Sequence, residues 1–141
     1  MTGERDLAGG IIQLANLLTR RLGPVFERQK ITPQQWSVLS ALNAEDGAVT
    51  LVALSRRLGV TKQNMTGMIT RLEQLGLAER NDDPSDMRSS RVALTRRGRG
   101  VVEKVRPAYE EWLSSLGGGS LSGRELQSLT RSVERLIEAL A

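Results

Sequence analysis

The chain has 141 residues, of which 26% are charged, and a formal net charge of +4 at pH 7. It contains no cysteine and no histidine, which excludes zinc sites built from those ligands and catalysis by a cysteine nucleophile. This length predicts a single domain over residues 1–141 that buries a core without disulfides or metals, and we expect neither a metal nor a cofactor.

The sequence gives no sign of a membrane segment. No apolar run approaches the roughly 20 residues of a membrane-spanning helix, and the first residues lack the apolar core of a signal peptide. The absence of cysteine also fits a cytosolic protein. We therefore expect a cytoplasmic protein without a membrane partner.

Two helices are predicted in the first third of the chain. Over residues 5–28, apolar side chains recur at steps of three and four, which is a helical stripe. Such a wide stripe on a terminal helix needs a partner surface. The run Thr32-Pro33-Gln34-Gln35 then supplies an N-cap, a first-turn proline and a capping-box glutamine for a second helix that carries Trp36 and Leu39. A very short strand around Ala48-Val49 can follow it.

The stretch from Thr50 to Gly76 contains two short helical patterns joined at Gly59. Thr50 and Thr61 are suitable N-caps, and glycine readily takes the left-handed conformation that ends a helix. Over residues 61–75 the apolar positions face one side. The opposite side is polar and carries Lys62, Gln63, Thr66, Gly67, Thr70 and Gln74. This pattern predicts a helix-turn-helix with a recognition helix, although similar helix pairs also occur in bundles that do not bind DNA.

A β-hairpin is predicted directly after the recognition helix. Two short, partly apolar flanks surround a segment rich in Asp, Asn, Ser and Pro, which favour turns. Such a hairpin is a wing, and its loop can carry an arginine into the neighbouring minor groove of DNA. Arg88 is the candidate for that arginine, and Asp86 can orient it through a bidentate pair.

These residues resemble a known family. The run from Asp83 to Gly98, with Asp86-Met87-Arg88 followed by Leu94-Thr95-Arg96-Arg97-Gly98, resembles the wing signature of the MarR family of bacterial transcriptional regulators. The upstream pattern also resembles that family's recognition helix and its exit, with Leu58-Gly59-Val60 and then Leu72-Glu73-Gln74-Leu75-Gly76-Leu77. Met87 stands where many members carry a charge, and Gly67 puts a side-chain base contact at its position in doubt. The resemblance implies a homodimeric DNA-binding regulator, most often a ligand-responsive repressor.

Two further helices are predicted at the C-terminal end. Thr95 caps a helix over about Arg96–Leu116, in which Pro107 should cause a kink. Three glycines follow, and Ser122-Gly123-Arg124-Glu125 opens a last helix with a long apolar stripe. The apolar stripes of the first, fifth and sixth helices lack partners in so small a protein. We therefore expect residues 1–30 and 100–141 to form dimerisation helices around a head of residues 31–99.

The fold class is therefore mainly α, a winged helix-turn-helix with a short β-hairpin wing and dimerisation helices at both ends. The segment from Thr50 to Arg106 holds 12 Lys+Arg against 6 Asp+Glu, hence +6, whereas the flanks hold 8 against 10, hence −2. A positive head attracts the DNA backbone. The proposed DNA-binding residues are Thr61, Lys62, Gln63, Asn64, Thr66, Thr70, Arg71, Asp86 and Arg88.

The main prediction is a sequence-specific regulator that binds a pseudo-palindromic operator in double-stranded DNA. The alternative is a helical protein-interaction module whose winged helix no longer binds DNA. We do not expect an enzyme, because no paired carboxylates share a face and no phosphate-binding loop follows a strand. In the MarR-like arrangement, a small aromatic or amphipathic effector would lie beside the first, second and fifth helices, near Leu14, Leu18, Trp36, Leu39, Val101 and Val105. Trp36 can equally be ordinary core.

Overall fold

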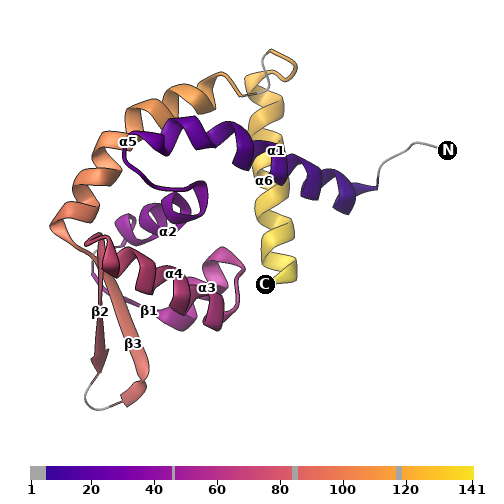
Figure 1. Cartoon of the computed structure of the whole chain (residues 1–141). Coiled ribbons are helices and arrows are strands. Elements are labelled where there is room, and N and C mark those ends of the chain that lie inside the picture. The colour runs from indigo at the N-terminus through magenta and orange to yellow at the C-terminus, as the bar shows by residue number, and fades with distance from the viewer. Residues whose placement is uncertain (1–5, 46, 84–85, 117–118) are drawn as a thin grey trace.

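The computed structural model of the chain describes residues 6–45, 47–83, 86–116 and 119–141. Helices dominate it, and a small three-stranded sheet lies at one end (Figure 1). This is the mainly α architecture with a β-hairpin that the sequence predicts. Its elements are α1 (Leu7–Glu27), α2 (Pro33–Asn43), β1 (Val49–Thr50), α3 (Leu51–Leu58), α4 (Lys62–Gln74), β2 (Ala78–Asp83), β3 (Asp86–Leu94), α5 (Arg96–Ser114) and α6 (Gly123–Leu140).

The helix starts confirm the predicted caps. The hydroxyls of Thr50, Thr61 and Thr95 each accept a hydrogen bond from the backbone N–H three residues later. Thr32 and Ser122 form complete capping boxes with the glutamine and glutamate three residues on. These bonds satisfy N–H groups that would otherwise lack partners in the first turn, so each helix starts where its polar side chain stands.

The sheet has the order β1-β3-β2, and both pairings are antiparallel. Val49 pairs with Val92, which confirms a very short strand before α3, at Val49–Thr50 rather than Ala48-Val49. β2 and β3 form the wing, with a register irregularity between Asp82 and Asp83. In Figure 1 the hairpin projects away from the helices, and α4 lies beside its base.

The core is continuous from the helix-turn-helix to the first half of α5. Met65, Ile69 and Leu72 of α4 are fully buried, as is Val92 of β3. A three-ring aromatic cluster ties α1, α2 and α5 together, with ring centroids of Phe26 and Trp36 5.5 Å apart and those of Trp36 and Tyr109 5.2 Å apart. The head therefore has a stable platform within a single chain.

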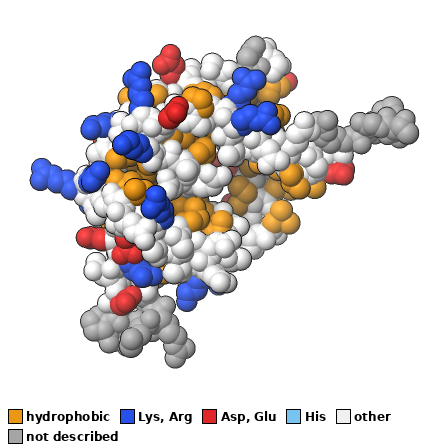
Figure 2. Space-filling model, in the orientation of Figure 1, with side chains coloured by type: hydrophobic (Ala, Val, Ile, Leu, Met, Phe, Trp, Pro, Cys, Tyr) orange, Lys and Arg blue, Asp and Glu red, His pale blue; other side chains and the backbone are white. Residues whose placement is uncertain are grey.

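Two helices keep apolar side chains at the surface. No residue of α6 is buried, and Val133, Leu136 and Ile137 are 41%, 38% and 53% exposed. The N-terminal half of α1 is similar, with Leu7 at 68% and Ile12 at 64%. Figure 2 has the orientation of Figure 1, in which α1 and α6 lie on the right, and it shows hydrophobic side chains at the surface on that side. These helices have too little contact within one chain to satisfy their apolar faces.

α5 continues as a helix through Pro107 and ends at Ser114, two residues before the predicted end. Figure 1 shows its axis curving along its length, in agreement with the expected effect of a proline inside a helix. Across the described residues, no helix combines the length and apolar character needed to cross a membrane.

Candidate nucleic-acid interface

The turn between α3 and α4 is set by one glycine. Gly59 has φ +67°, the left-handed conformation predicted for it, and its N–H donates to the carbonyl of Arg56 at 3.2 Å. The next N–H, from Val60, donates to Ser55 at 3.0 Å. Thr61 then caps α4. Because the turn is this tight, α4 lies across α3 with its apolar face buried and its polar face outward.

The outward face of α4 contains the predicted reading residues. Lys62, Gln63, Asn64 and Thr70 are exposed, and Thr66 is half-buried. Gly67 lies in the middle of this face, and a Cβ added there would have no heavy atom within 4 Å. The surface is therefore flat at Gly67, so a base can approach the backbone, but no side chain contacts it.

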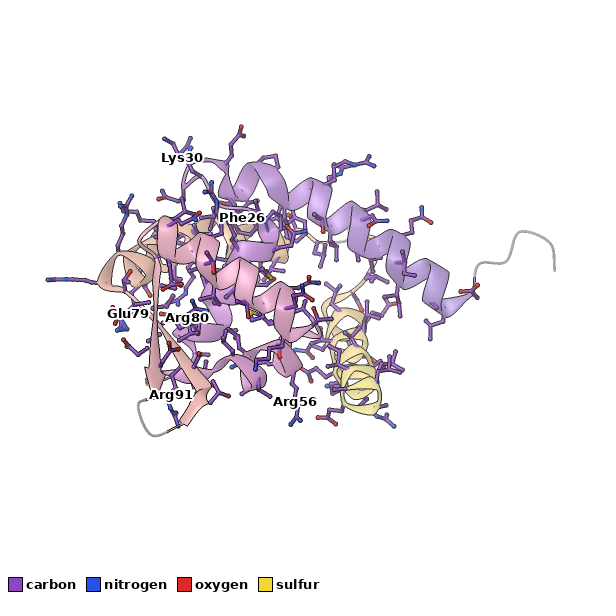
Figure 3. All side chains as sticks on the ribbon, turned by 60° about the horizontal axis from the view of Figure 1, so that its bottom comes forward. Phe26, Lys30, Arg56, Glu79, Arg80 and Arg91 are labelled. Atoms are coloured by element: carbon purple, nitrogen blue, oxygen red, sulfur yellow. The ribbon has the colours of Figure 1, made fainter. Side chains whose placement is uncertain are left out.

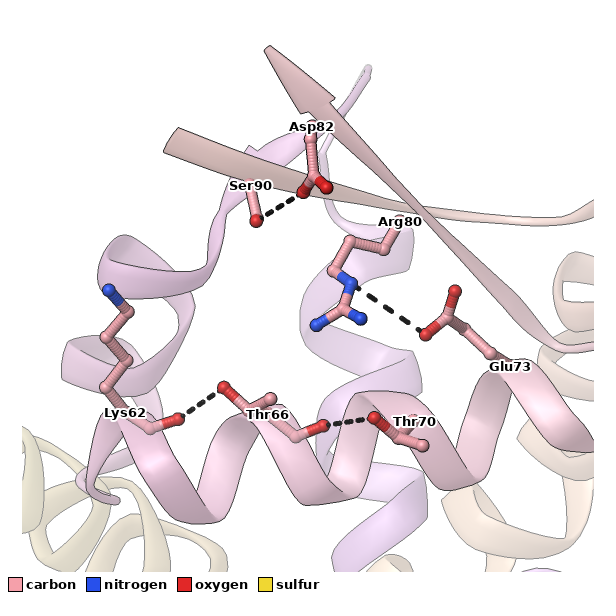
Figure 4. Close-up of polar contacts among 7 residues, drawn as sticks. All are labelled: Lys62, Thr66, Thr70, Glu73, Arg80, Asp82 and Ser90. Carbon is pink, nitrogen blue, oxygen red and sulfur yellow. Dashed lines mark hydrogen bonds and ion pairs between the residues drawn. The ribbon is translucent and has the colours of Figure 1, made fainter. Parts of the chain in front are cut away.

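The threonines of this face have a defined chemistry. Thr66 Oγ1 donates to the Lys62 carbonyl and Thr70 Oγ1 to the Thr66 carbonyl, both at 2.9 Å (Figure 4). With their protons engaged, these hydroxyls offer acceptor lone pairs and methyl groups to a ligand. The side-chain donors must come from Lys62, Gln63 and Asn64. The face thus combines donors at the start of the helix with acceptors and methyls farther along, which suits base edges and thymine methyls.

Arg71 lies apart from that row. Its Nη1 donates to Gln74 Oε1 at 3.3 Å. Its side chain also lines a cavity of about 540 Å³ between α4 and the start of α2, with Thr32, Gln34, Gln35, Val60, Asn64, Gly67 and Met68. A guanidinium in this place can contact a phosphate at the edge of a groove.

The wing carries contacts that the sequence analysis missed. Arg80 Nε lies 4.0 Å from Glu73 Oε1, so the wing and the end of α4 share an ion pair. Ser90 Oγ donates to Asp82 Oδ1 at 2.6 Å across the two strands (Figure 4). The strand period of two could have revealed them, since Arg80 and Asp82 follow buried Ala78 on the same face.

The proposed wing arginine, Arg88, lies on β3, the second strand of the wing. Asp86 and Arg88 belong to β3, but their side chains lie outside the described part of the structure. The predicted pair between them therefore stays a prediction. The described strands nevertheless place residue 88 close to the wing tip, because β2 and β3 join at the pairing of Asp83 with Asp86.

The motif after the wing fixes the hairpin to α5. The Thr95 N–H donates to the Leu77 carbonyl at 3.1 Å, and its hydroxyl donates to the Gly76 carbonyl at 2.7 Å. Gly98 packs so closely that a Cβ there would lie 2.1 Å from the Leu77 oxygen. The threonine and the glycine of the Leu-Thr-x-x-Gly pattern therefore join the exit of the recognition helix to α5.

The basic residues of α3 differ in availability. Arg57 Nη1 lies 3.0 Å from Glu45 Oε1 and also donates to the Ala41 carbonyl at 3.5 Å. Arg56 is exposed and labelled in Figure 3, and none of the ion pairs between described residues includes it. Arg56 is thus better placed than Arg57 to meet a phosphate.

The six residues suggested for an effector do not surround one crevice. Leu39 and Val105 are core residues, 0% and 2% exposed, whereas Leu14 is 47% exposed. Leu18 and Trp36 do line a common cavity of about 230 Å³ with Tyr109, and Val101 lines a different one. Trp36 is 6% exposed and stacks on Phe26, so most of its ring is core. No group of His, Cys, Asp or Glu within the described ranges could hold a metal.

Comparisons with known proteins agree with this geometry. A model of the MarR family matches residues 29–89. An uncharacterized HTH-type transcriptional regulator of Mycobacterium leprae (strain TN) is 34% identical over 108 residues, which cover 77% of this chain and 72% of the relative. A mutant MarR from Escherichia coli complexed with operator DNA matches with a TM-score of 0.74 and 27% identity, covering 94% of this chain and 99% of that one. NadR in complex with 4-hydroxyphenylacetate matches with a TM-score of 0.79 and 25% identity, covering 97% and 96%.

Proposed function

The chain belongs to the MarR family, and we propose that it is a sequence-specific transcriptional regulator that binds double-stranded DNA as a homodimer. The observation that carries this proposal is the exposed polar face of α4, which projects from a tight helix-turn-helix beside a β-hairpin. An α-helix fits the major groove, and a hairpin next to it reaches the adjacent minor groove.

The residues have separate roles in this proposal. Lys62, Gln63 and Asn64 donate to base edges, and Thr66 and Thr70 contribute methyls and acceptors. Thr61 and Arg71 lie at the edge of the face and contact the phosphate backbone. Arg88 enters the minor groove, with Asp86 orienting it. Phosphate contacts set the position of the protein and base contacts set the sequence, so the two groups should respond differently to mutation.

The homodimer would be built from α1, α5 and α6, which makes residues 1–30 and 100–141 the dimerisation part and residues 31–99 the head. The exposed apolar stripes of α1 and α6 support this division. A two-fold dimer presents two heads to successive major grooves, about 34–36 Å between centres, and so requires a pseudo-palindromic operator.

We further propose that the protein is a repressor whose DNA affinity depends on a small ligand. A dimer seated on an operator that overlaps a promoter excludes the polymerase from it. The complex of the related NadR with 4-hydroxyphenylacetate supports a small organic effector. A ligand can release DNA only if it binds the DNA-incompetent state more tightly, by about 5 kcal/mol for a nearly complete switch.

A gel shift with the DNA directly upstream of its own gene tests DNA recognition. Gln63→Ala should weaken binding to that fragment by about 1–3 kcal/mol, the usual size of one specific base contact, while binding to scrambled DNA stays the same. Gln127→Ala, the same change on exposed α6, is the matched control and should have no effect. Equal affinity of the wild type for cognate and scrambled DNA would instead favour an interaction module.

Sedimentation equilibrium tests the dimer. Leu136→Glu puts a charge into the apolar stripe of α6 and should dissociate the dimer at micromolar concentration. Gln127→Glu introduces the same charge nine residues away, on the opposite side of the helix, and should leave the dimer intact. If both variants sediment as the wild type does, α6 is not the dimer interface.

A further inference from the structure

A cavity of about 350 Å³ lies where three segments of the chain meet, apart from the reading face. Of the six residues suggested for an effector, Val101 lines it. We call it the junction cavity. One wall is the loop between α1 and α2, another is the exit of α4, and the third is the first half of α5. Its lining residues are Gln29, Lys30, Ile31, Leu75, Leu77, Arg97, Gly100, Val101 and Lys104.

Three cations line the junction cavity, and no carboxylate does. Lys30, Arg97 and Lys104 come from two of the walls. None of them takes part in the ion pairs formed between residues that the structure describes. Positive charges that share one concave site repel each other, and they raise the local concentration of anions. The cavity therefore favours a ligand with more than one negative charge.

The rest of the lining is largely apolar. Ile31 and Leu77 are 5% and 4% exposed, and Leu75 and Val101 are partly buried hydrophobics packed on the core. These side chains place apolar atoms next to the three cations. A bare phosphate, or the backbone of DNA, would not use such a surface. A ligand with a short apolar body attached to its charged group would use both parts of the site.

Lys30 has a backbone conformation that supports a binding role. Its φ is +57°, and it is the one non-glycine residue with a positive φ among those described. Lys30, which is labelled in Figure 3, follows the end of α1, and its N–H donates to the Glu27 carbonyl at 3.0 Å. Glycine or asparagine takes such a position with less strain. A strained residue whose side chain lines a cavity is a reason to look for a ligand there.

We propose that the junction cavity binds a small organic dianion with a short apolar body, for example an aryl phosphate. Bound there, the ligand links the exit of the recognition helix to α5 and to the α1–α2 loop. The occupancy of the cavity is independent of DNA. Its expected effect on DNA affinity rests on the proposed function, because the ligand would bias the orientation of the head.

Isothermal titration calorimetry without DNA tests the site directly. Phenyl phosphate, which is a dianion at pH 8, should bind with one site per chain. Inorganic phosphate lacks the apolar body and benzoate lacks the second charge, so each should bind about tenfold more weakly or not measurably. Absence of phenyl phosphate binding at millimolar concentration, or equal affinity for all three anions, would overturn the proposal.

Three variants locate the binding site. Lys30→Asn and Lys104→Gln should each weaken phenyl phosphate binding about tenfold. Arg20→Gln removes a cation from exposed α1 outside the lining and should leave the affinity unchanged. Lys30→Asn should also unfold at the same temperature as the wild type or higher, since it relieves strain, so misfolding cannot explain its loss of binding.

Two results would refute the assigned location or ligand. One is that Lys30→Asn and Lys104→Gln bind phenyl phosphate as tightly as the control Arg20→Gln does. The other is displacement of phenyl phosphate by a short non-specific duplex, which would assign the cations to the DNA backbone. If the anion binds as expected but never changes DNA affinity, the site stands and only its regulatory link to the proposed function fails.

Discussion

Replacing Gly98 by alanine should destabilise the protein, even though alanine is the better helix former. The added Cβ would lie 2.1 Å from the Leu77 carbonyl oxygen and 3.2 Å from Leu94 Cδ2. The first contact is with backbone, so the turn after α4 and the start of α5 must move apart by about 1 Å. Overpacking of this kind costs about 1–3 kcal/mol, whereas the gain in helix propensity is about 1 kcal/mol at most. With a gain of about 0.5–1 kcal/mol, the net loss is up to about 2.5 kcal/mol.

Gly100→Ala is the matched control, two residues along the same helix. A Cβ at Gly100 would meet nothing within 4 Å, so this variant should be more stable than the wild type by about 0.5–1 kcal/mol. Thermal unfolding at one fixed chain concentration measures both, and 1 kcal/mol corresponds to about 2–4 °C for a domain of this size. Gly98→Ala should also weaken operator binding, since it displaces the bonds of Thr95 to the exit of α4. If both alanines stabilise the protein equally, the close contact at Gly98 does not exist.

Four other predictions follow from the interface. Neutralising about six to eight phosphates per dimer gives a slope of log K against log salt near −5 to −7, and a slope shallower than about −2 would contradict the electrostatic argument. Arg88→Ala should weaken operator binding by about 1–3 kcal/mol per minor-groove contact without unfolding the protein, so unchanged affinity would disprove the wing contact. Changes at Asn64 should alter which operator bases matter, whereas Arg71→Ala should lower affinity for all sequences, as competition with operator variants would show. Peroxide at levels too low to oxidise methionine should leave DNA binding intact, because the chain has no cysteine, and release of DNA would show another redox route.

Local chemistry made much of this fold predictable. The N-caps at Thr32, Thr50, Thr61, Thr95 and Ser122 each depend on a bond to a residue only three positions away, so the sequence alone located them. The left-handed Gly59 is equally local. The polar side of α4 follows from the helical period, and that is why its exposed residues were the ones expected.

Contacts between distant segments were harder to predict. The bond from Thr95 to Gly76 spans 19 positions, and the aromatic cluster joins Phe26 to Tyr109. The suggested effector residues follow from the MarR-like arrangement and from the apolar positions of three helices, and such positions cannot distinguish a residue in the core from one at a crevice. Of these residues, Leu39 and Val105 lie in the core, whereas Leu18 lines a cavity. The strained φ of Lys30 has no sequence signal at all, because lysine rarely takes that conformation.

The same long-range contacts restrict how two heads in a dimer can change their spacing. The Thr95 bonds fix the start of α5 to the exit of α4, and the tilted ring contacts of Tyr109 with Phe26 and Trp36 fix α5 again about four turns later. Within one chain, the head and α5 as far as Tyr109 must therefore move together. Beyond Tyr109, α5 has no buried residue, and neither does α6. Any adjustment of head spacing has to arise there or between the two chains, since packed cores do not deform continuously.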